Sequence, residues 1–428
     1  MGDELQHINV GGENMKLSFK YYPKLNGLQQ DIIEELSFHT TKIYNIINYD
    51  LRENEYKNYY AIEKEYKSNW HCGYLHSHTR QQCFKMIEQN WKSYFASIKD
   101  YNKNPSKYLG KPRPPKFKNH NNRKNEIIFT KAGIRHQDNI LKLSLSKEMK
   151  TKFEVQSLNF IIESDKIPFN LDDIQQIKIQ WDNSSKRWYL NIIYNKKIVN
   201  ITENYTNIMA IDLGLNNLAT ITFQNNIESY IIDGKYIKSK NSYYNKEIAR
   251  LTSIVMKQCK NSEYFKRTKK INKLQTKRNN FIKDYIHKSS KIIIDLAIIH
   301  KCKTIVIGDF GGIKQKNKVK SFVQIPQQEL VNKIKYKAEL LGIEVIMQNE
   351  AYTSGCSALD LEPINKKYYN KNRRIKRGLF ISDTGITINA DINGSLNILR
   401  KYNKCTPRLV KQARDNGFLD NPIRLRVA

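Results

Sequence analysis

The chain has 428 residues and carries 73 Lys and Arg against 41 Asp and Glu, a formal net charge of +32. A protein with this excess repels itself unless a polyanion neutralises it, and nucleic acid is the usual one. An AT-rich genome explains a preference for Lys over Arg, but it does not explain the shortage of Asp and Glu. Because Lys and Arg occur in most segments, the sequence favours a long binding channel over a basic tail.

Hydropathy and cysteine usage indicate the cellular compartment of the protein. No apolar run approaches the ~20 residues that a membrane span needs, and the polar residues 1–14 do not resemble a signal peptide. The six cysteines are scattered without a CxxC pair, which is typical of free thiols in a reducing compartment. We therefore expect a cytoplasmic protein that contacts no membrane and has two or three domains.

The first half mixes strand-like and helix-like patterns. An alternating strand begins at Met15, and apolar residues at helical spacing predict helices over 28–60 and 76–101. A Pro-rich basic stretch over 110–118 cannot be helical, and strand-like runs follow at 126–130, 140–145, 174–179 and 188–194. These patterns predict a flexible N-terminus (1–14), a small β-barrel (15–26 and 120–205) and a helical insertion (27–119).

The second half, 206–428, has the element order of an RNase H-like domain. Strands are predicted at 208–212, 218–223 and 227–232, and a basic helical hairpin is predicted over 241–301. A strand at 304–308, a helix over 326–341 and a strand at 344–349 complete the order β-β-β-α-β-α-β. We therefore predict a mixed α+β and α/β protein.

Two carboxylates stand at the positions that this fold offers to a metal. Asp212 ends the buried strand of the segment IMAIDLGLNN (208–217), and Asp391 opens a helix in NADINGSLN (389–397). In this fold the first and fourth strands lie side by side, so their ends are about 4.8 Å apart. Carboxylates that converge there suit Mg²⁺ or Mn²⁺, whereas a lone Asp at a strand end also caps a turn.

These segments resemble RuvC-type nucleases, which usually have a Glu ligand at the end of the fourth strand, so the resemblance implies a third ligand there. The segment TIVIGDF (304–310) has Gly308 at that point. Asp309 follows, but alternation points it to the other face. Glu350 follows the neighbouring strand, and its side chain is long enough to reach the empty position. An isolated Glu before a loop is usually a surface residue, yet beside a missing ligand we favour Glu350 over Asp309.

These segments resemble a RuvC-type nuclease. Together with 39–45, 110–117 and 352–354 they are similar to the TnpB family, transposon-encoded RNA-guided DNA nucleases ancestral to type V CRISPR effectors. The resemblance implies a wedge-like barrel, a helical recognition insertion, and a RuvC-like domain with a helical hairpin insertion. It also implies a target-nucleic-acid-binding insertion at 352–388. The chain departs from the family at Gly308, where Glu is usual. The family's zinc ribbon is absent as well, since between Tyr352 and Asn389 only Cys356 offers a zinc ligand, so no structural zinc is expected.

The resemblance implies an RNA-guided DNA endonuclease with one RuvC site, in which Asp212, Glu350 and Asp391 bind two Mg²⁺ or Mn²⁺ ions for phosphodiester hydrolysis. The implied partners are a structured guide RNA and double- and single-stranded target DNA with a short target-adjacent motif, bound by a monomer or by a homodimer on one RNA. The alternative is a nuclease-dead, RNA-guided DNA-binding transcriptional repressor, which the loss of Glu at Gly308 motivates. A DNA transposase has no support in the residues. The polar and basic residues predicted to bind nucleic acid are Gln81, Gln82, Lys85, Lys111, Arg113, Lys116, Arg278, Arg373, Arg374 and Arg377.

Overall fold

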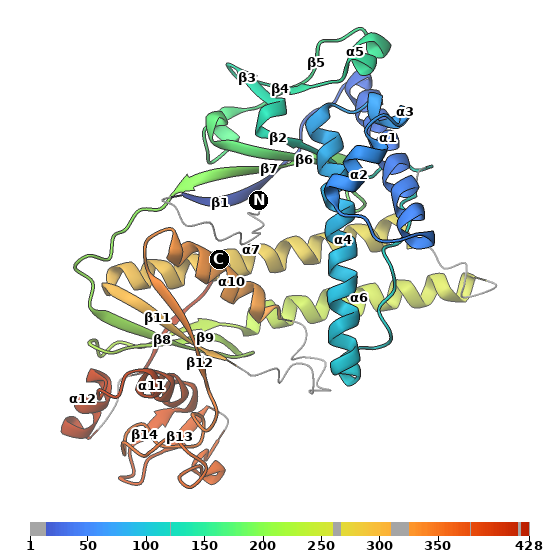
Figure 1. Cartoon of the computed structure of the whole chain (residues 1–428). Coiled ribbons are helices and arrows are strands. Elements are labelled where there is room, and N and C mark those ends of the chain that lie inside the picture. The colour runs from blue at the N-terminus through green and yellow to red at the C-terminus, as the bar shows by residue number, and fades with distance from the viewer. Residues whose placement is uncertain are drawn as a thin grey trace. The chain divides into compact units, whose positions relative to one another are not determined.

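The computed structural model describes residues 14–119, 121–259, 267–309, 325–376, 378–417 and 421–427. The chain divides into two compact units, Met1–Lys196 and Lys197–Ala428 (Figure 1). Each unit has its own sheets and its own buried side chains. Among the described residues, no helix has the length and apolar character needed to cross a membrane.

The strands of the N-terminal unit form two sheets. One has four strands in the order β1-β7-β6-β2, and the other has three in the order β3-β4-β5. This pairing does not confirm a closed barrel, which stays a prediction. The strands β3 and β5 and the helix α5 were not predicted, because each is only a few residues long. The bounds are β1 Asn14–Tyr21, β2 Ile127–Thr130, β3 Ile134–Gln137, β4 Ile140–Ser144, α5 Lys147–Phe153, β5 Ser157–Ile161, β6 Ile174–Asp182 and β7 Arg187–Lys197.

Four helices stand between β1 and β2: α1 (Gly27–Glu53), α2 (Tyr59–Tyr66), α3 (Trp70–Gly73) and α4 (Ser77–Lys103). The single helix predicted over 28–60 is wrong in its end, because α1 stops at Glu53 and Asn58 caps a new helix by accepting from the amide of Ala61. Asn is a strong N-cap residue, so its side chain favours a helix start over a helix interior. The Pro-rich stretch is extended, as predicted, and its Pro115 carbonyl accepts a hydrogen bond from Asn48 of α1.

The C-terminal unit is built on a six-stranded sheet in the order β12-β11-β8-β9-β10-β15. The strands β12, β11 and β8 are parallel, β9 is antiparallel to both β8 and β10, and β15 is parallel to β10. This mixed sheet agrees with the predicted RNase H-like order; only the short β15 was not predicted. The bounds are β8 Asn207–Leu213, β9 Asn217–Phe223, β10 Tyr230–Asp233, β11 Cys302–Asp309, β12 Glu344–Asn349 and β15 Ile423–Leu425.

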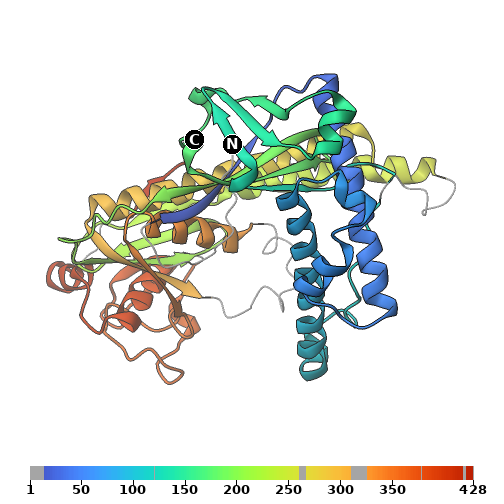
Figure 2. The ribbon, with the colours of Figure 1, turned by 45° about the horizontal axis from the view of Figure 1, so that its top comes forward.

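Helices cover both faces of this sheet. On one face, Ile211 of β8 and Ile307 of β11 share a buried core with side chains of α7 (Lys269–Ile299) and α10 (Gln327–Glu339). On the other face, Ala210 and Val306 pack against Ile398 of α11 (Ala390–Tyr402). Figure 2 shows α7 running beside α6 (Lys235–Gln258) as a helical hairpin. Successive residues of β8 and β11 therefore face opposite layers.

Candidate active site

Asp212 lies on the face of the sheet that α11 covers. It is two residues after Ala210, so alternation places both side chains on the same face. The helix comes unusually close at this point, because a Cβ on Gly394 would stand 2.6 Å from Oδ2 of Asp212. Ser395, the next residue, fixes the helix to the sheet by donating to the Ala210 carbonyl (3.1 Å). Glycine at 394 therefore makes the room that the Asp212 carboxylate occupies.

Glu350 fills the position over Gly308. A Cβ on Gly308 would meet Oε2 of Glu350 at 2.8 Å and the Ile398 side chain, also at 2.8 Å. The parallel register pairs Gly308 with Gln348 of β12, so Glu350 stands two residues beyond that pair. The main chain then turns, and the Glu350 carbonyl accepts from both the amide (3.1 Å) and the hydroxyl (2.8 Å) of Thr353. The carboxylate thus reaches across from the neighbouring strand into the space that a side chain at 308 would use.

Asp391 enters the site from the first turn of α11. Asn389 caps this helix by accepting from the amides of Asp391 (2.9 Å) and Ile392. Asn217 of β9 donates to Oδ2 of Asp391 (2.7 Å), and Arg374 donates to Oδ1 (3.3 Å). Both oxygens of Asp391 are therefore oriented by neighbours. No local pattern in the sequence singles out Asn217, because its contact with Asp391 depends on the β8–β9 pairing.

The electrostatics join the three carboxylates. Burial raises the pKa of Asp212 well above its ordinary value, the negative charges of Asp391 and Glu350 raise it further, and Arg374 acts in the opposite direction. Burial, with a smaller contribution from Asp309, raises the pKa of Glu350 to about 7. Within the described part of the chain, neither Asp212 nor Glu350 has a hydrogen-bond or ion-pair partner for its carboxylate. In this part of the chain, Asp212 and Glu350 therefore have no directly bonded positively charged partner.

Asp309 belongs to the opposite side of β11. Its neighbours Ile305 and Ile307 face α7 and α10, whereas Val306 faces α11. Alternation therefore places Gly308 on the α11 face and Asp309 on the other, and Asp309 is exposed. The charge of Asp309 raises the pKa of Glu350, but it is not among the charges that shift the pKa of Asp212. This geometry favours Glu350 over Asp309 for the position that Gly308 leaves open.

The donor set suits a divalent cation. The charges of Glu350 at the end of β12 and of Asp391 on α11 both raise the pKa of Asp212 on β8, and the described residues offer no donor to the half-buried carboxylates of Asp212 and Glu350. Hard cations such as Mg²⁺ take oxygen ligands of this type. Both glycines that open the space, Gly308 and Gly394, lie beside these carboxylates. The residues present therefore fit a metal-dependent site.

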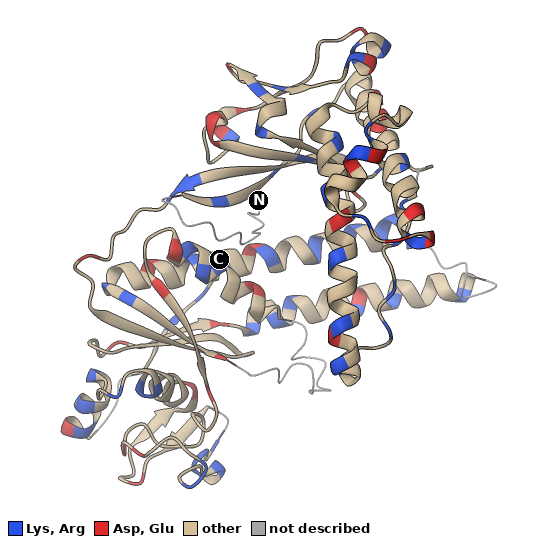
Figure 3. Cartoon of the chain, viewed as in Figure 1, with Lys and Arg blue, Asp and Glu red and all other residues tan. Residues whose placement is uncertain are grey.

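The residues predicted to bind nucleic acid fall into different settings. Lys85, Lys111, Arg113 and Lys116 are exposed, whereas Gln81 and Gln82 are half-buried and Gln81 donates to Glu63. Arg278 of α7 donates to Asn241 of α6 at 2.6 Å. Arg374 contacts Asp391, and Arg373 is held by carboxylates. Arg377 lies outside the described residues. Figure 3 shows Lys and Arg on most elements of both units.

Comparison with known proteins agrees with this fold. The family model described as "Probable transposase" (OrfB_IS605) matches residues 192–313, and the model "Cas12f1-like, TNB domain" matches 328–398. A TnpB-like protein ORF457 of Acidianus two-tailed virus is 21% identical over 411 residues, which cover 88% of this chain and 84% of the viral protein. The chain is similar in sequence to this TnpB-like protein over most of its length.

Two further similarities concern Cas12f1. The CRISPR-associated endodeoxyribonuclease Cas12f1 of Sulfoacidibacillus thermotolerans is 27% identical over 288 residues, 62% of this chain. The match spans 64% of that relative's length. A cryo-EM structure of a Cas12f1–sgRNA–target DNA complex has a TM-score of 0.60 at 16% identity, covering 90% of this chain and 99% of that one. The structural likeness establishes the α+β fold.

Proposed function

We propose that this protein is an RNA-guided DNA endonuclease that cleaves target DNA in a single RuvC-like site. The observation that carries the proposal is the cluster of Asp212, Glu350 and Asp391 on the α11 face of the sheet, where Glu350 occupies the space above Gly308. A nuclease-dead repressor would have no need of these carboxylates. The names of two similar proteins, an endodeoxyribonuclease and a complex with guide and target, point the same way.

The three carboxylates have separate tasks in this proposal. Asp212 is held on a rigid central strand, and Asp391 is oriented by Asn217 and Asn389 before any ligand arrives. Glu350 supplies the third carboxylate from the neighbouring strand. Two Mg²⁺ or Mn²⁺ ions bound there would activate a water molecule and stabilise the charge that develops on the leaving oxygen. Prearranged ligands lower the cost of assembling such a site.

The proposed partners follow from the charge and from the likeness. A formal charge of +32 suits a guide RNA paired to a DNA strand, since both are polyanions. In such complexes base pairing identifies the target, while the protein recognises shape and a short flanking motif. The proposed contacts to nucleic acid are basic side chains exposed on and after α4, namely Lys85, Lys111, Arg113 and Lys116.

Purification of the protein from cells that express its own locus tests this function. We expect one defined RNA to co-purify, and the RNA-bound protein to cleave DNA complementary to it when Mg²⁺ is added. The absence of co-purifying RNA, together with DNA binding that survives RNase, would contradict the guided mechanism. Tight guided binding with intact DNA would instead identify the nuclease-dead repressor.

A further inference from the structure

The segment between β12 and α11 has little regular structure. Its described residues, 350–376 and 378–389, include only a short 3-10 helix (Lys371–Arg373) and a hairpin of β13 (Leu379–Ile381) and β14 (Thr387–Asn389). Side chains therefore fix much of its backbone. Two side-chain amides of α11 hold the start of this segment. The Asn393 side chain donates to the Cys356 carbonyl (2.9 Å), and the Asn397 side chain donates to the Thr353 carbonyl (2.9 Å).

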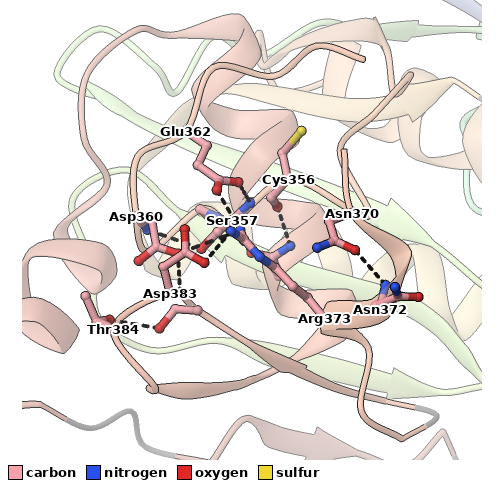
Figure 4. A network of polar contacts seen from close by, with 12 residues as sticks. Cys356, Ser357, Asp360, Glu362, Asn370, Asn372, Arg373, Asp383 and Thr384 are labelled. Atoms are coloured by element: carbon pink, nitrogen blue, oxygen red, sulfur yellow. Dashed lines mark hydrogen bonds and ion pairs between the residues drawn. The ribbon is translucent and has the colours of Figure 1, made fainter. Parts of the chain in front are cut away.

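Arg373 is the centre of the remaining contacts (Figure 4). Its Nη1 donates to Glu362 (2.6 Å) and lies 3.9 Å from Asp360, and its Nη2 donates to Asp383 in the turn of the hairpin. The Arg373 side chain is only 14% exposed. Asp360 also accepts from the amide of Asp383 (2.8 Å). One guanidinium thus joins three separate parts of the segment.

This contact set differs from what the sequence predicts for Arg373. Its guanidinium is committed to carboxylates, which favours a structural role over contact with nucleic acid. The carboxylates of Asp360, Glu362 and Asp383 lie close enough together to suggest a metal, but Arg373 already supplies positive charge among them. The planar guanidinium offers several N–H donors in a fixed geometry, so it can bind several carboxylates at once.

The next residue faces the active-site cluster instead. Arg374 forms an ion pair with Asp391 (3.3 Å), and its charge counteracts the rise in the pKa of Asp212. Its side chain is 44% exposed, and Asp391 is the one partner found for it within the described residues. The two adjacent arginines therefore serve two different carboxylate clusters, and the backbone position of the first determines where the second can reach.

We propose that Arg373 is a positioning residue: by binding Asp360, Glu362 and Asp383 it holds Arg374 against Asp391, and in this way it sets the affinity of the active-site carboxylates for divalent cations. The inference rests on the proposed function, because it takes Asp212, Glu350 and Asp391 to be the cation site. A positive charge beside Asp391 competes with a cation for that carboxylate. Loss of the contact should therefore tighten cation binding.

Titration calorimetry with Mg²⁺ on the full chain tests the coupling. Arg374→Met should tighten Mg²⁺ binding roughly threefold, the effect expected for loss of one partly exposed ion pair. Arg373→Met should give the same shift, and the double variant should add nothing further. Lys371→Met removes the same charge from the exposed part of the same turn and should leave the affinity unchanged. Arg373→Lys keeps the charge without the guanidinium geometry and should give a partial shift.

Removal of Arg373 also frees three carboxylates, so a control must exclude Mg²⁺ binding there. In an Asp212→Ala background the shift caused by Arg373→Met should disappear. A shift that persists, or shifts of the two single variants that multiply in the double variant, would overturn the proposal. So would an Arg373→Met protein with wild-type Mg²⁺ affinity.

Hydrogen–deuterium exchange separates this inference from the proposed function. Arg373→Met should speed exchange of backbone amides between 355 and 391, and Arg374→Met should not. Wild-type protein that binds no Mg²⁺ would contradict the proposed cation site. The exchange comparison would then decide on Arg373 alone, and unchanged exchange in Arg373→Met would reject its positioning role.

Discussion

At the scale of single residues, the main feature of this chain is that the Glu350 carboxylate occupies the space that Gly308 leaves open. A side chain at 308 and the carboxylate of Glu350 cannot occupy the same space, because a Cβ at 308 would stand 2.8 Å from the Glu350 oxygen. The absence of a side chain at Gly308 and the presence of Glu350 are therefore two parts of one arrangement. Burial raises the pKa values of both Asp212 and Glu350, and the charges of Asp391 and Glu350 raise the pKa of Asp212 further.

The raised pKa of Glu350 predicts a pH-dependent stability. In the metal-free folded protein this carboxyl stays protonated up to about pH 7, against an ordinary value of 4.5, so its contribution to stability is lost as pH rises through about 7. Glu350→Gln cannot ionise. At about pH 8 and without metal it should raise the free energy of unfolding by on the order of 3 kcal/mol, since the pKa rises from 4.5 to about 7 and each pKa unit is worth about 1.4 kcal/mol.

The same substitution should have almost no effect on stability near pH 3, well below the ordinary pKa of 4.5, where Glu350 is protonated in both the folded and the unfolded state. Urea unfolding in EDTA at the two pH values measures the difference. An equal effect at both would show that the carboxyl is not destabilised by its surroundings. Added Mg²⁺ should reverse the order at high pH, because only the ionised wild-type site gains stability from the cation.

The contact between positions 308 and 350 also predicts when a restored ligand can function. Gly308→Glu in the wild-type chain should destabilise the protein by about 1–3 kcal/mol, since the new side chain overpacks against Glu350 and Ile398. The Glu350→Ala background removes the contact with Glu350 and leaves the contact with Ile398. In that background Gly308→Glu should recover part of the cleavage lost in Glu350→Ala. Recovery by Gly308→Gln to the same extent would show that the carboxylate is not what is restored.

At the scale of elements, α11 carries Asp391 and at the same time makes room for Asp212. The apolar Ile398 and Leu399 pack against the sheet, and the buried polar residues Asn393 and Asn397 hold the preceding segment. Glycine lowers the stability of a helix interior. A buried side-chain amide contributes to stability only when it is hydrogen-bonded. The composition of this helix is therefore explained by what it contacts.

Gly394→Ala should damage the site through this close approach. The added Cβ would stand 2.6 Å from Oδ2 of Asp212, so either the carboxylate or the helix must shift. We expect Mg²⁺ affinity to fall at least tenfold, because a displacement of ligands by a few tenths of an ångström is poorly tolerated by Mg²⁺. Calorimetric titration measures it. Gly27→Ala, at a position with nothing within 4 Å, is the matched control and should bind Mg²⁺ normally. Unchanged affinity in Gly394→Ala would argue against Asp212 as a ligand.

At the scale of the whole molecule, strong periodicity made the second half predictable. Strands 8 to 12 and the helices around them follow from apolar runs and Gly or Asn turns, and alternation separates Gly308 from Asp309. Short strands such as β3, β5 and β15 carry too few residues for a pattern. Contacts made only by tertiary folding, such as Asn217 with Asp391 and Arg373 with its three carboxylates, have no local signal in the sequence.

Guided cleavage by matched single variants tests the central claim, that Glu350 replaces the ligand missing at Gly308. With co-purified RNA, complementary DNA and Mg²⁺, Glu350→Gln should lower the cleavage rate by at least about a thousandfold while guide and target binding stay near wild type. Asp212→Ala and Asp391→Ala should behave alike, and Asp309→Asn should cleave at close to the wild-type rate. An inactive Asp309→Asn beside an active Glu350→Gln would contradict the account and transfer the role to Asp309.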